Sequence, residues 1–103
     1  MSVISTMQIT LREGVKAQAI EAFKARGVFS ECAEAIPGFL WAHLLAGAGD
    51  TLCVMSEWRN AQSYEDWLAH PARAAQEADL AHYLAAAPET GLFEAQDTFE
   101  RAR

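Results

Sequence analysis

Hydrophobic and polar residues alternate from the start of the chain. In residues 3–11, one face of an extended segment would carry Val3, Ser5, Met7, Ile9 and Leu11, while mainly polar residues fill the other. An alternation of period two that includes β-branched residues predicts a half-buried strand.

The spacing becomes helical after residues 12–14. Apolar positions from Val15 to Phe23 recur near one face, which predicts an amphipathic helix that begins at Val15. Gly27 is expected to interrupt this helix, because glycine costs about 1 kcal/mol relative to alanine in a helix interior. A second helical piece is expected over 28–36.

Pro37 and Gly38 end the helical pattern and start an extended stretch over 39–47. The alternation predicts one face made of Phe39, Trp41, His43 and Leu45. A glycine-rich turn follows, and then a strand over 51–58 that is apolar on both faces as far as Ser56, which is typical of a central strand. Two strands joined by so short a loop predict an antiparallel hairpin.

A second helical region is expected to begin at Asn60 or Ser63, with Tyr64, Trp67 and Leu68 at helical spacing. Proline is tolerated only in the first turn of a helix, so Pro71 should begin a new helical piece.

That piece, 72–87, is alanine-rich and should end at Pro88, and 91–100 should form the last strand. The expected order is strand, helix, strand, strand, helix, strand. This is the α+β ferredoxin-like βαββαβ order, a four-stranded antiparallel sheet with both helical regions on one face. A second copy is the simplest cover for the other face, which predicts a twofold homodimer.

Length and composition predict one soluble domain over 1–103. The chain is 51% hydrophobic and 21% charged, as in globular proteins, and its net charge of -6 disfavours nucleic acid as a partner. The basic residues are scattered, so an anionic membrane surface is not expected either.

The sequence also favours a cytoplasmic protein. Cys32 and Cys53 are best interpreted as reduced core thiols, because two cysteines make no disulfide framework. The first residues do not resemble a signal peptide, and no stretch approaches the about 20 apolar residues of a membrane span.

The segment EWRNAQSYEDWLAHP, from Glu57 to Pro71, resembles the antibiotic biosynthesis monooxygenase (ABM) family. In that family a strand ending in Trp is followed by a short helix with an aromatic residue or His, and then by a turn with Pro. The resemblance implies a dimeric α/β barrel, with a pocket in each subunit between the sheet and the helices. Some members oxidise aromatic phenols or quinols with molecular oxygen and without metal or flavin.

Other members of the family bind and degrade heme. Members of this branch use an Asn on the first strand, a Trp on the second helical region and, ten residues after that Trp, a His as axial ligand of the heme iron. The resemblance allows these three positions to be compared with this sequence. Trp67 matches the tryptophan, but Met7 stands at the first position and Glu77 at the ligand position. Classical heme degradation is therefore disfavoured. We expect no cofactor, with heme as the alternative.

Trp67 and Tyr64 are candidates for the substrate-binding wall of this pocket, since aromatic rings offer flat surface and a polar atom. Their spacing also suits the core face of a helix, and both interpretations can hold. Met7 and Met55 could line the pocket or fill the core, because methionine adapts to irregular shapes.

His70 and His43 are the candidate catalytic residues, because imidazole can take a phenolic proton near neutral pH. His70 could instead cap a helix, and His43 could lie in a dimer interface if its strand face is the dimer side. No spacing supports a metal site.

Three hypotheses result. The first is a cofactor-independent monooxygenase that acts on a small or polycyclic phenol or quinol, and the second is a protein that binds heme through His70 or His82 in place of the absent ligand. The third is a dimeric module that binds a hydrophobic ligand without catalysis.

Overall fold

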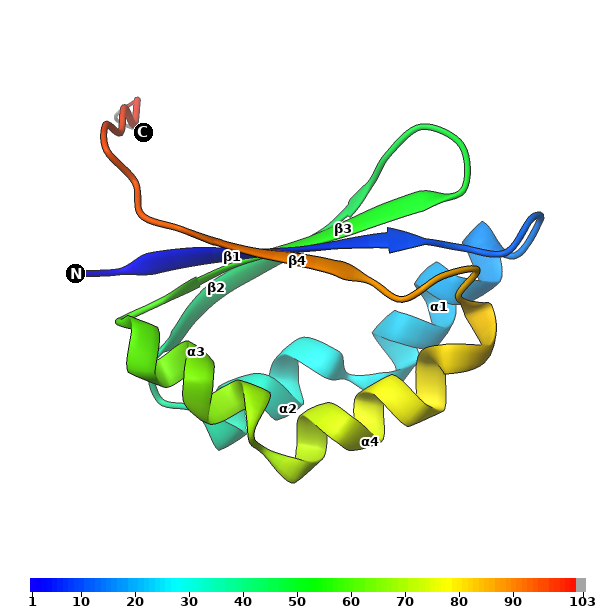
Figure 1. The fold of residues 1–103 in the computed structure, drawn as a ribbon, viewed down its shortest axis with the longest axis horizontal. Coiled ribbons are helices and arrows are strands. Elements are labelled where there is room, and N and C mark those ends of the chain that lie inside the picture. Colours follow the sequence, from blue (N-terminus) through cyan, green and yellow to red (C-terminus); the bar gives the residue numbers. More distant parts are fainter. Residues whose placement is uncertain (102–103) are drawn as a thin grey trace.

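The chain folds as one antiparallel sheet whose helices all lie on the same face (Figure 1). The computed structural model describes residues 1–101. Its elements, in chain order, are β1 (Val3–Thr10), α1 (Lys16–Arg26), α2 (Val28–Ala35), β2 (Phe39–Ala46), β3 (Thr51–Trp58), α3 (Ala61–Leu68), α4 (Pro71–Leu80), the 3-10 turn η1 (Ala81–Tyr83) and β4 (Glu89–Phe93). The strand order is β2-β3-β1-β4 with every pair antiparallel, which confirms the predicted ferredoxin-like fold.

The helix boundaries follow local chemistry. Gly27 has φ 69° and separates α1 from α2, a left-handed conformation that glycine adopts at little cost. The side chain of Asn60 caps α3 by accepting a hydrogen bond from the backbone N–H of Ser63 at 2.9 Å. Pro71 is the first residue of α4, as predicted.

The core consists of two clusters rather than one. Under one end of the sheet lies the Trp58 cluster, and under the other lies the Ile9 cluster. The members are Val3, Cys32, Ile36, Trp58 and Trp67 in the first, and Ile9, Leu11, Ala19 and Leu52 in the second. α4 packs mainly on α1 and α2 rather than on a strand, so the middle of the helical layer stands away from the sheet.

A β-bulge in β2 corrects the predicted strand face. Phe39 pairs with Trp58 while Trp41 pairs with Glu57, so Leu40 is an extra residue without a partner opposite it. The extra residue reverses the alternation. Phe39 therefore points to the helices, whereas Trp41 and the residues at every second position after it point to the other face.

Two predicted boundaries near the C-terminus are wrong. The helix expected over 72–87 ends at Leu80, because Leu84 bridges to Leu11 and the backbone N–H of Ala85 donates to the Thr10 carbonyl, which holds this segment extended. The strand expected over 91–100 ends at Phe93. That residue pairs with Ile4, close to the start of β1, so the ladder has almost no partner residues left beyond it.

The face of the sheet opposite the helices, here called the helix-free face, is partly apolar. It carries Trp41, Leu45 and Phe93, whose exposed fractions are 37%, 40% and 57%. The tail after β4 leaves the sheet on this side (Figure 1). Within residues 1–101, no helix is long and apolar enough to cross a membrane.

Candidate functional site

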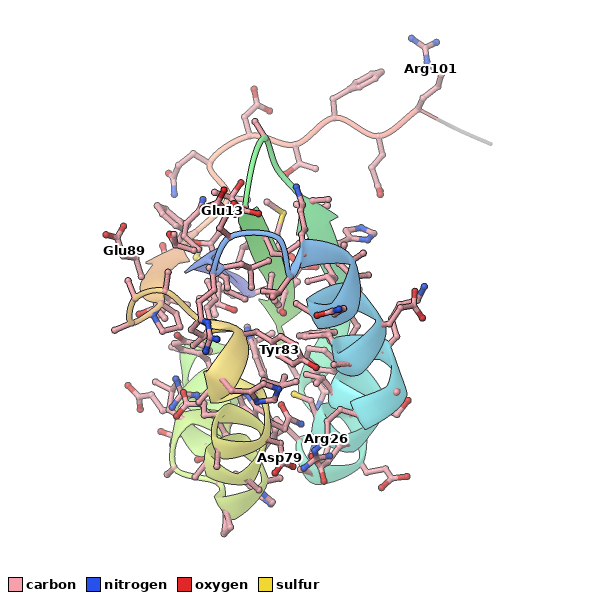
Figure 2. The ribbon with its side chains drawn as sticks, turned by 90° about the vertical axis from the view of Figure 1, so that its right-hand side faces the viewer. Glu13, Arg26, Asp79, Tyr83, Glu89 and Arg101 are labelled. Carbon is pink, nitrogen blue, oxygen red and sulfur yellow. The ribbon has the colours of Figure 1, made fainter. Side chains whose placement is uncertain are left out.

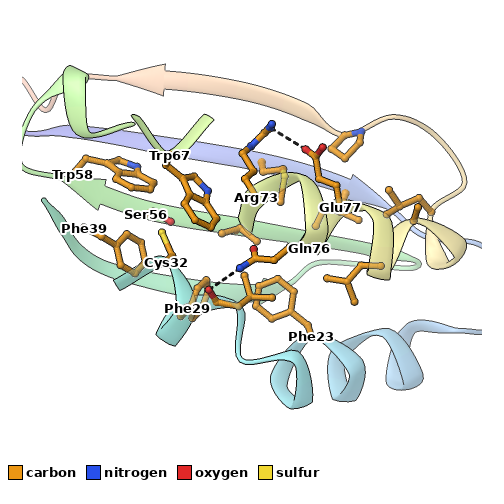
Figure 3. A pocket seen from close by; sticks show the side chains of 18 residues that line it. Phe23, Phe29, Cys32, Phe39, Ser56, Trp58, Trp67, Arg73, Gln76 and Glu77 are labelled. Carbon is orange, nitrogen blue, oxygen red and sulfur yellow. Dashed lines mark hydrogen bonds and ion pairs between the residues drawn. The ribbon is translucent and has the colours of Figure 1, made fainter. Parts of the chain in front are cut away.

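A cavity of about 330 Å³ lies between the sheet and the helices (Figure 3). Its lining includes members of both core clusters, so the cavity separates them. The lining residues come from β1, β2, β3, all four helices and the segment that leads to β4. They are Met7, Ile9, Phe23, Val28, Phe29, Cys32, Phe39, Val54, Ser56, Trp58, Trp67, Arg73, Gln76, Glu77, Leu80, Ala81, Leu84 and Pro88.

Aromatic rings form much of the wall. Phe23 meets Phe29 edge to face at 5.2 Å between ring centroids, and Phe39 meets Trp58 at 5.0 Å. Trp58 is fixed from behind by a hydrogen bond of 2.9 Å from its Nε1 to Ser5 Oγ. Such a wall is preorganised for a flat apolar ligand, and the volume is at the lower end of the roughly 300–1,000 Å³ of small-molecule sites.

Three polar atoms open into this apolar space. Ser56, Trp67 and Gln76 are buried, with exposed fractions of 4%, 8% and 7%. In the part of the chain that the structure describes, Ser56 Oγ, Trp67 Nε1 and Gln76 Oε1 have no hydrogen-bond partner. Every polar side-chain atom that is completely buried there does have a partner. These three atoms therefore keep some accessible surface, and the cavity is the space that they line. They can bind polar groups of a ligand.

One ion pair lines the cavity at its more exposed side. Arg73 Nη2 and Glu77 Oε1 are 3.0 Å apart, on successive turns of α4, and their side chains are 27% and 55% exposed. They are the only charged side chains among the described lining residues. A cation here can stabilise negative charge on a ligand, while solvent screens it from one side.

Cys32 meets the cavity as a neutral thiol. It is 3% exposed, and burial raises its pKa from 9.0 to about 12. Since the thiolate is the nucleophile and the metal ligand, this side chain is chemically quiet at neutral pH.

The structure brings only some of the predicted site residues to the cavity. Trp67 on α3 and Met7 on β1 line it. Tyr64 is not among the lining residues, and its ring packs edge to face against Trp58 with 5.5 Å between the ring centroids. The substrate-binding roles of Trp67 and Met7 stay predictions.

His43 and Met55 lie on the helix-free face, so they are not part of the cavity in which a catalytic and a substrate-binding role were predicted for them. They pair directly across β2 and β3, and the bulge at Leu40 turns this face away from the helices. His43 packs its ring against Trp41 at 5.3 Å. Met55 alternates with the inward residues Val54 and Ser56, so it cannot reach the cavity.

His70 is a helix cap. Its Nδ1 accepts a hydrogen bond of 3.0 Å from the backbone N–H of Ala72, and its ring stacks on Trp67 at 5.9 Å. In the neutral ring the proton is then on Nε2, and the basic nitrogen is already occupied. This geometry does not support the predicted role of general base, and His70 does not line the cavity.

Several lining residues were missed by the sequence analysis. Arg73, Gln76, Glu77 and Leu80 recur at the i, i+3, i+4, i+7 spacing of a buried helix face. Because three of these four residues are polar, the pattern does not stand out as an inward face. Phe39 was missed for another reason, since the bulge is not visible in the alternation.

The donor set offers little to a heme iron. No histidine occurs among the described residues of the lining, Glu77 is paired with Arg73, and burial keeps Cys32 protonated. No group of three or more His, Cys, Asp or Glu within residues 1–101 is arranged to hold a metal ion.

Comparison with known proteins identifies the family of this fold. The family model described as antibiotic biosynthesis monooxygenase matches residues 2–87. No curated protein matches the chain by sequence.

Solved structures share the fold over nearly the whole chain. SnoaB, described as a cofactor-independent oxygenase from Streptomyces nogalater, is 22% identical with a TM-score of 0.78, over 97% of this chain and 98% of that one. The monooxygenase from the gene ActVA-Orf6 of Streptomyces coelicolor, in complex with nanaomycin D, is 19% identical with a TM-score of 0.83, over 98% and 93%. Rv0793 from Mycobacterium tuberculosis is 16% identical with a TM-score of 0.75, over 97% and 100%.

The burial of Cys32 predicts a loss of stability at alkaline pH. Unfolding exposes the thiol, whose pKa returns to 9.0, so above pH 9 the unfolded chain binds fewer protons than the folded one. The stability that depends on this thiol is thus complete below pH 9 and is lost as the pH rises toward 12. One such group gives a slope of about 1 kcal/mol per pH unit in the free energy of unfolding.

Urea unfolding at pH 9 and pH 10.5 measures this slope in the wild type and in a Cys32→Ala variant. We expect a shallower slope in the Cys32→Ala variant, whatever its absolute stability. Equal slopes in the wild type and in Cys32→Ala would contradict the conclusion that burial raises the pKa of the Cys32 thiol.

Proposed function

This chain belongs to the antibiotic biosynthesis monooxygenase family, and on that premise we propose that it is a cofactor-independent monooxygenase that oxidises a small or polycyclic phenol or quinol with molecular oxygen. The observation that carries the proposal is the aromatic cavity between sheet and helices, with its few inward polar atoms and one ion pair. Two structures of similar fold support it, because their descriptions name a cofactor-independent oxygenase and a monooxygenase bound to nanaomycin D.

The proposed chemistry uses the electrons of the substrate. An ionised phenol or quinol gives an electron to dioxygen, the resulting radicals combine at a ring carbon, and loss of water leaves a carbonyl there. One oxygen atom enters the product and the other leaves in that water. The protein has to bind the ring, favour the anion and keep bulk water away from the reacting carbon.

The lining residues suit these tasks. Trp67 and the phenylalanines hold a flat ring by apolar contact, while Arg73 offers a positive charge to the phenolate. Glu77 holds the Arg73 guanidinium in place and can pass the released proton to solvent, since its side chain is 55% exposed.

A homodimer is part of the proposal. The helix-free face exposes Trp41, Leu45 and Phe93, and a second copy of the same sheet would cover them. His43 would then be an interface residue, one of the two positions that the sequence left open for it.

We also propose a cytoplasmic location. Cys32 and Cys53 are both free thiols, and they lie on opposite faces of the sheet layer. Free thiols suit a reducing compartment.

A non-catalytic ligand-binding module is the second candidate. It is favoured by one observation: neither His43 nor His70 reaches the cavity, so the described lining contains no imidazole base. Tight binding of a hydroxylated aromatic that is recovered unchanged in air would support this candidate over the oxygenase.

Replacing Arg73 tests the electrostatic part of the mechanism. Arg73→Met keeps the apolar stem and removes the charge, so oxygen uptake with a hydroxylated anthrone should fall at least about tenfold. The rate is measured with an oxygen electrode after subtraction of the reaction without protein. Arg59→Met, at an exposed position outside the lining, is the matched control and should keep the wild-type rate. An Arg73→Met rate equal to that of the wild type would remove Arg73 from the mechanism.

A pair of leucines tests the dimer. Leu45 on the helix-free face and Leu68 on α3 are both 40% exposed, so an aspartate at either site changes the solvated surface equally. Sedimentation equilibrium should give a dimer mass for wild type and Leu68→Asp, and a monomer mass for Leu45→Asp. If Leu45→Asp also sediments as a dimer, the interface lies elsewhere.

A further inference from the structure

Gln76 is the most deeply buried polar side chain of α4. It is 7% exposed, it lines the cavity, and it is the only residue of α4 that is buried. A glutamine in such a position usually has its amide fully hydrogen-bonded, because an unsatisfied buried polar atom costs about 1–3 kcal/mol. Among residues 1–101, only the Nε2 end of this amide has hydrogen-bond partners.

Both donor contacts of the amide go to α2. Gln76 Nε2 donates to Glu31 Oε1 at 2.7 Å and to the backbone carbonyl of Val28 at 3.3 Å. Glu31 and Val28 offer only acceptors at these positions, so a flipped amide would set oxygen against oxygen. The orientation of the amide is therefore fixed by chemistry.

Two further residues hold Glu31 and its surroundings in place. Arg26 Nη1 lies 3.0 Å from Glu31 Oε1, and Arg26 Nε lies 2.9 Å from Asp79 Oδ2 on α4. Figure 2 shows Arg26, at the end of α1, and Asp79, on α4, facing each other. Hydrogen bonding to Asp79 is the main reason why the pKa of Arg26 is raised, so the cation of this bridge stays charged.

The remaining atom, Gln76 Oε1, opens into the cavity. It has no partner in the described structure, and in Figure 3 it points away from α2, into the space that also holds Trp67. Its two lone pairs can accept a hydrogen bond, but no hydrogen of this amide is left to donate to a ligand there.

From this geometry we propose that Gln76 determines substrate specificity by accepting a hydrogen bond from a hydroxyl group of the aromatic substrate. The hydroxyl is one that stays protonated, distinct from the phenolate that Arg73 stabilises. The substrate class is then a polyhydroxylated aromatic, and an aromatic with only carbonyl or ether oxygens at this position is rejected. The inference rests on the proposed function only in taking this cavity as the substrate site.

Binding of two probes of nearly equal size tests the proposal without turnover. 1-Naphthol can donate a hydrogen bond and 1-fluoronaphthalene cannot, and isothermal titration calorimetry gives both dissociation constants. The ratio of the two constants measures the preference for the hydroxyl. In Gln76→Met, which keeps the side-chain length, this preference should fall about tenfold, through weaker naphthol binding alone.

Three variants make the result specific. Gln18→Met, at an exposed position on α1, should keep the wild-type preference. Ser56→Ala removes the hydroxyl that β3 contributes to the lining, and it shows whether Ser56 rather than Gln76 binds the ligand hydroxyl. If Gln76→Met does not bind 1-fluoronaphthalene and so is not folded, Gln76→Asn replaces it, because a shorter amide cannot both reach Glu31 and present its carbonyl.

An unchanged preference in the folded Gln76 variant overturns the proposal, and so does a preference that disappears only in Ser56→Ala. Absence of binding of both probes to the wild type also overturns it. Failure of the oxygenase proposal would give a different result: oxygen uptake would be absent, while the binding preference and its dependence on Gln76 would persist.

Discussion

The cavity exists because α4 is held to the helical layer and not to the sheet. Hydrophobic burial alone would draw α4 down onto β1 and β3 and close the space between the two core clusters. The bridge from Gln76 and Asp79 on α4 to Arg26 and Glu31 acts laterally, along the helical layer. Because these charge-assisted contacts are directional, they fix where α4 lies without filling the space beneath it.

The same bridge keeps charged groups apart from the apolar interior of the cavity. Charges lie at the outer side of α4 or in the bridge, and the interior is left to aromatic rings and to single polar atoms such as Trp67 Nε1. In such a site, selectivity comes from a few oriented atoms in an apolar surrounding, where each hydrogen bond is least exposed to competition from water. Reaction with dioxygen would then depend on the position and the ionisation of the substrate more than on a protein base.

The fold could be predicted from the sequence because the periods of its strands and helices are clear, and because Gly27 and Pro71 mark helix boundaries. The site could be predicted only in part. Trp67 stands out as an aromatic residue at helical spacing, but Gln76 is hidden in a polar pattern that resembles a solvated face. The placement of His43 depended on one bulge residue, Leu40, and a bulge depends on pairing between strands, which no local pattern records.

A crystal structure of the protein with a bound hydroxyanthraquinone, a stable analogue of the expected product, would show where the aromatic ligand binds and which side chains contact it. We expect ring density in the cavity beneath α4, in contact with Trp67, and a ligand hydroxyl within hydrogen-bond distance of Gln76 Oε1. Ring density on the helix-free face, with the cavity holding only water at saturating ligand, would contradict it.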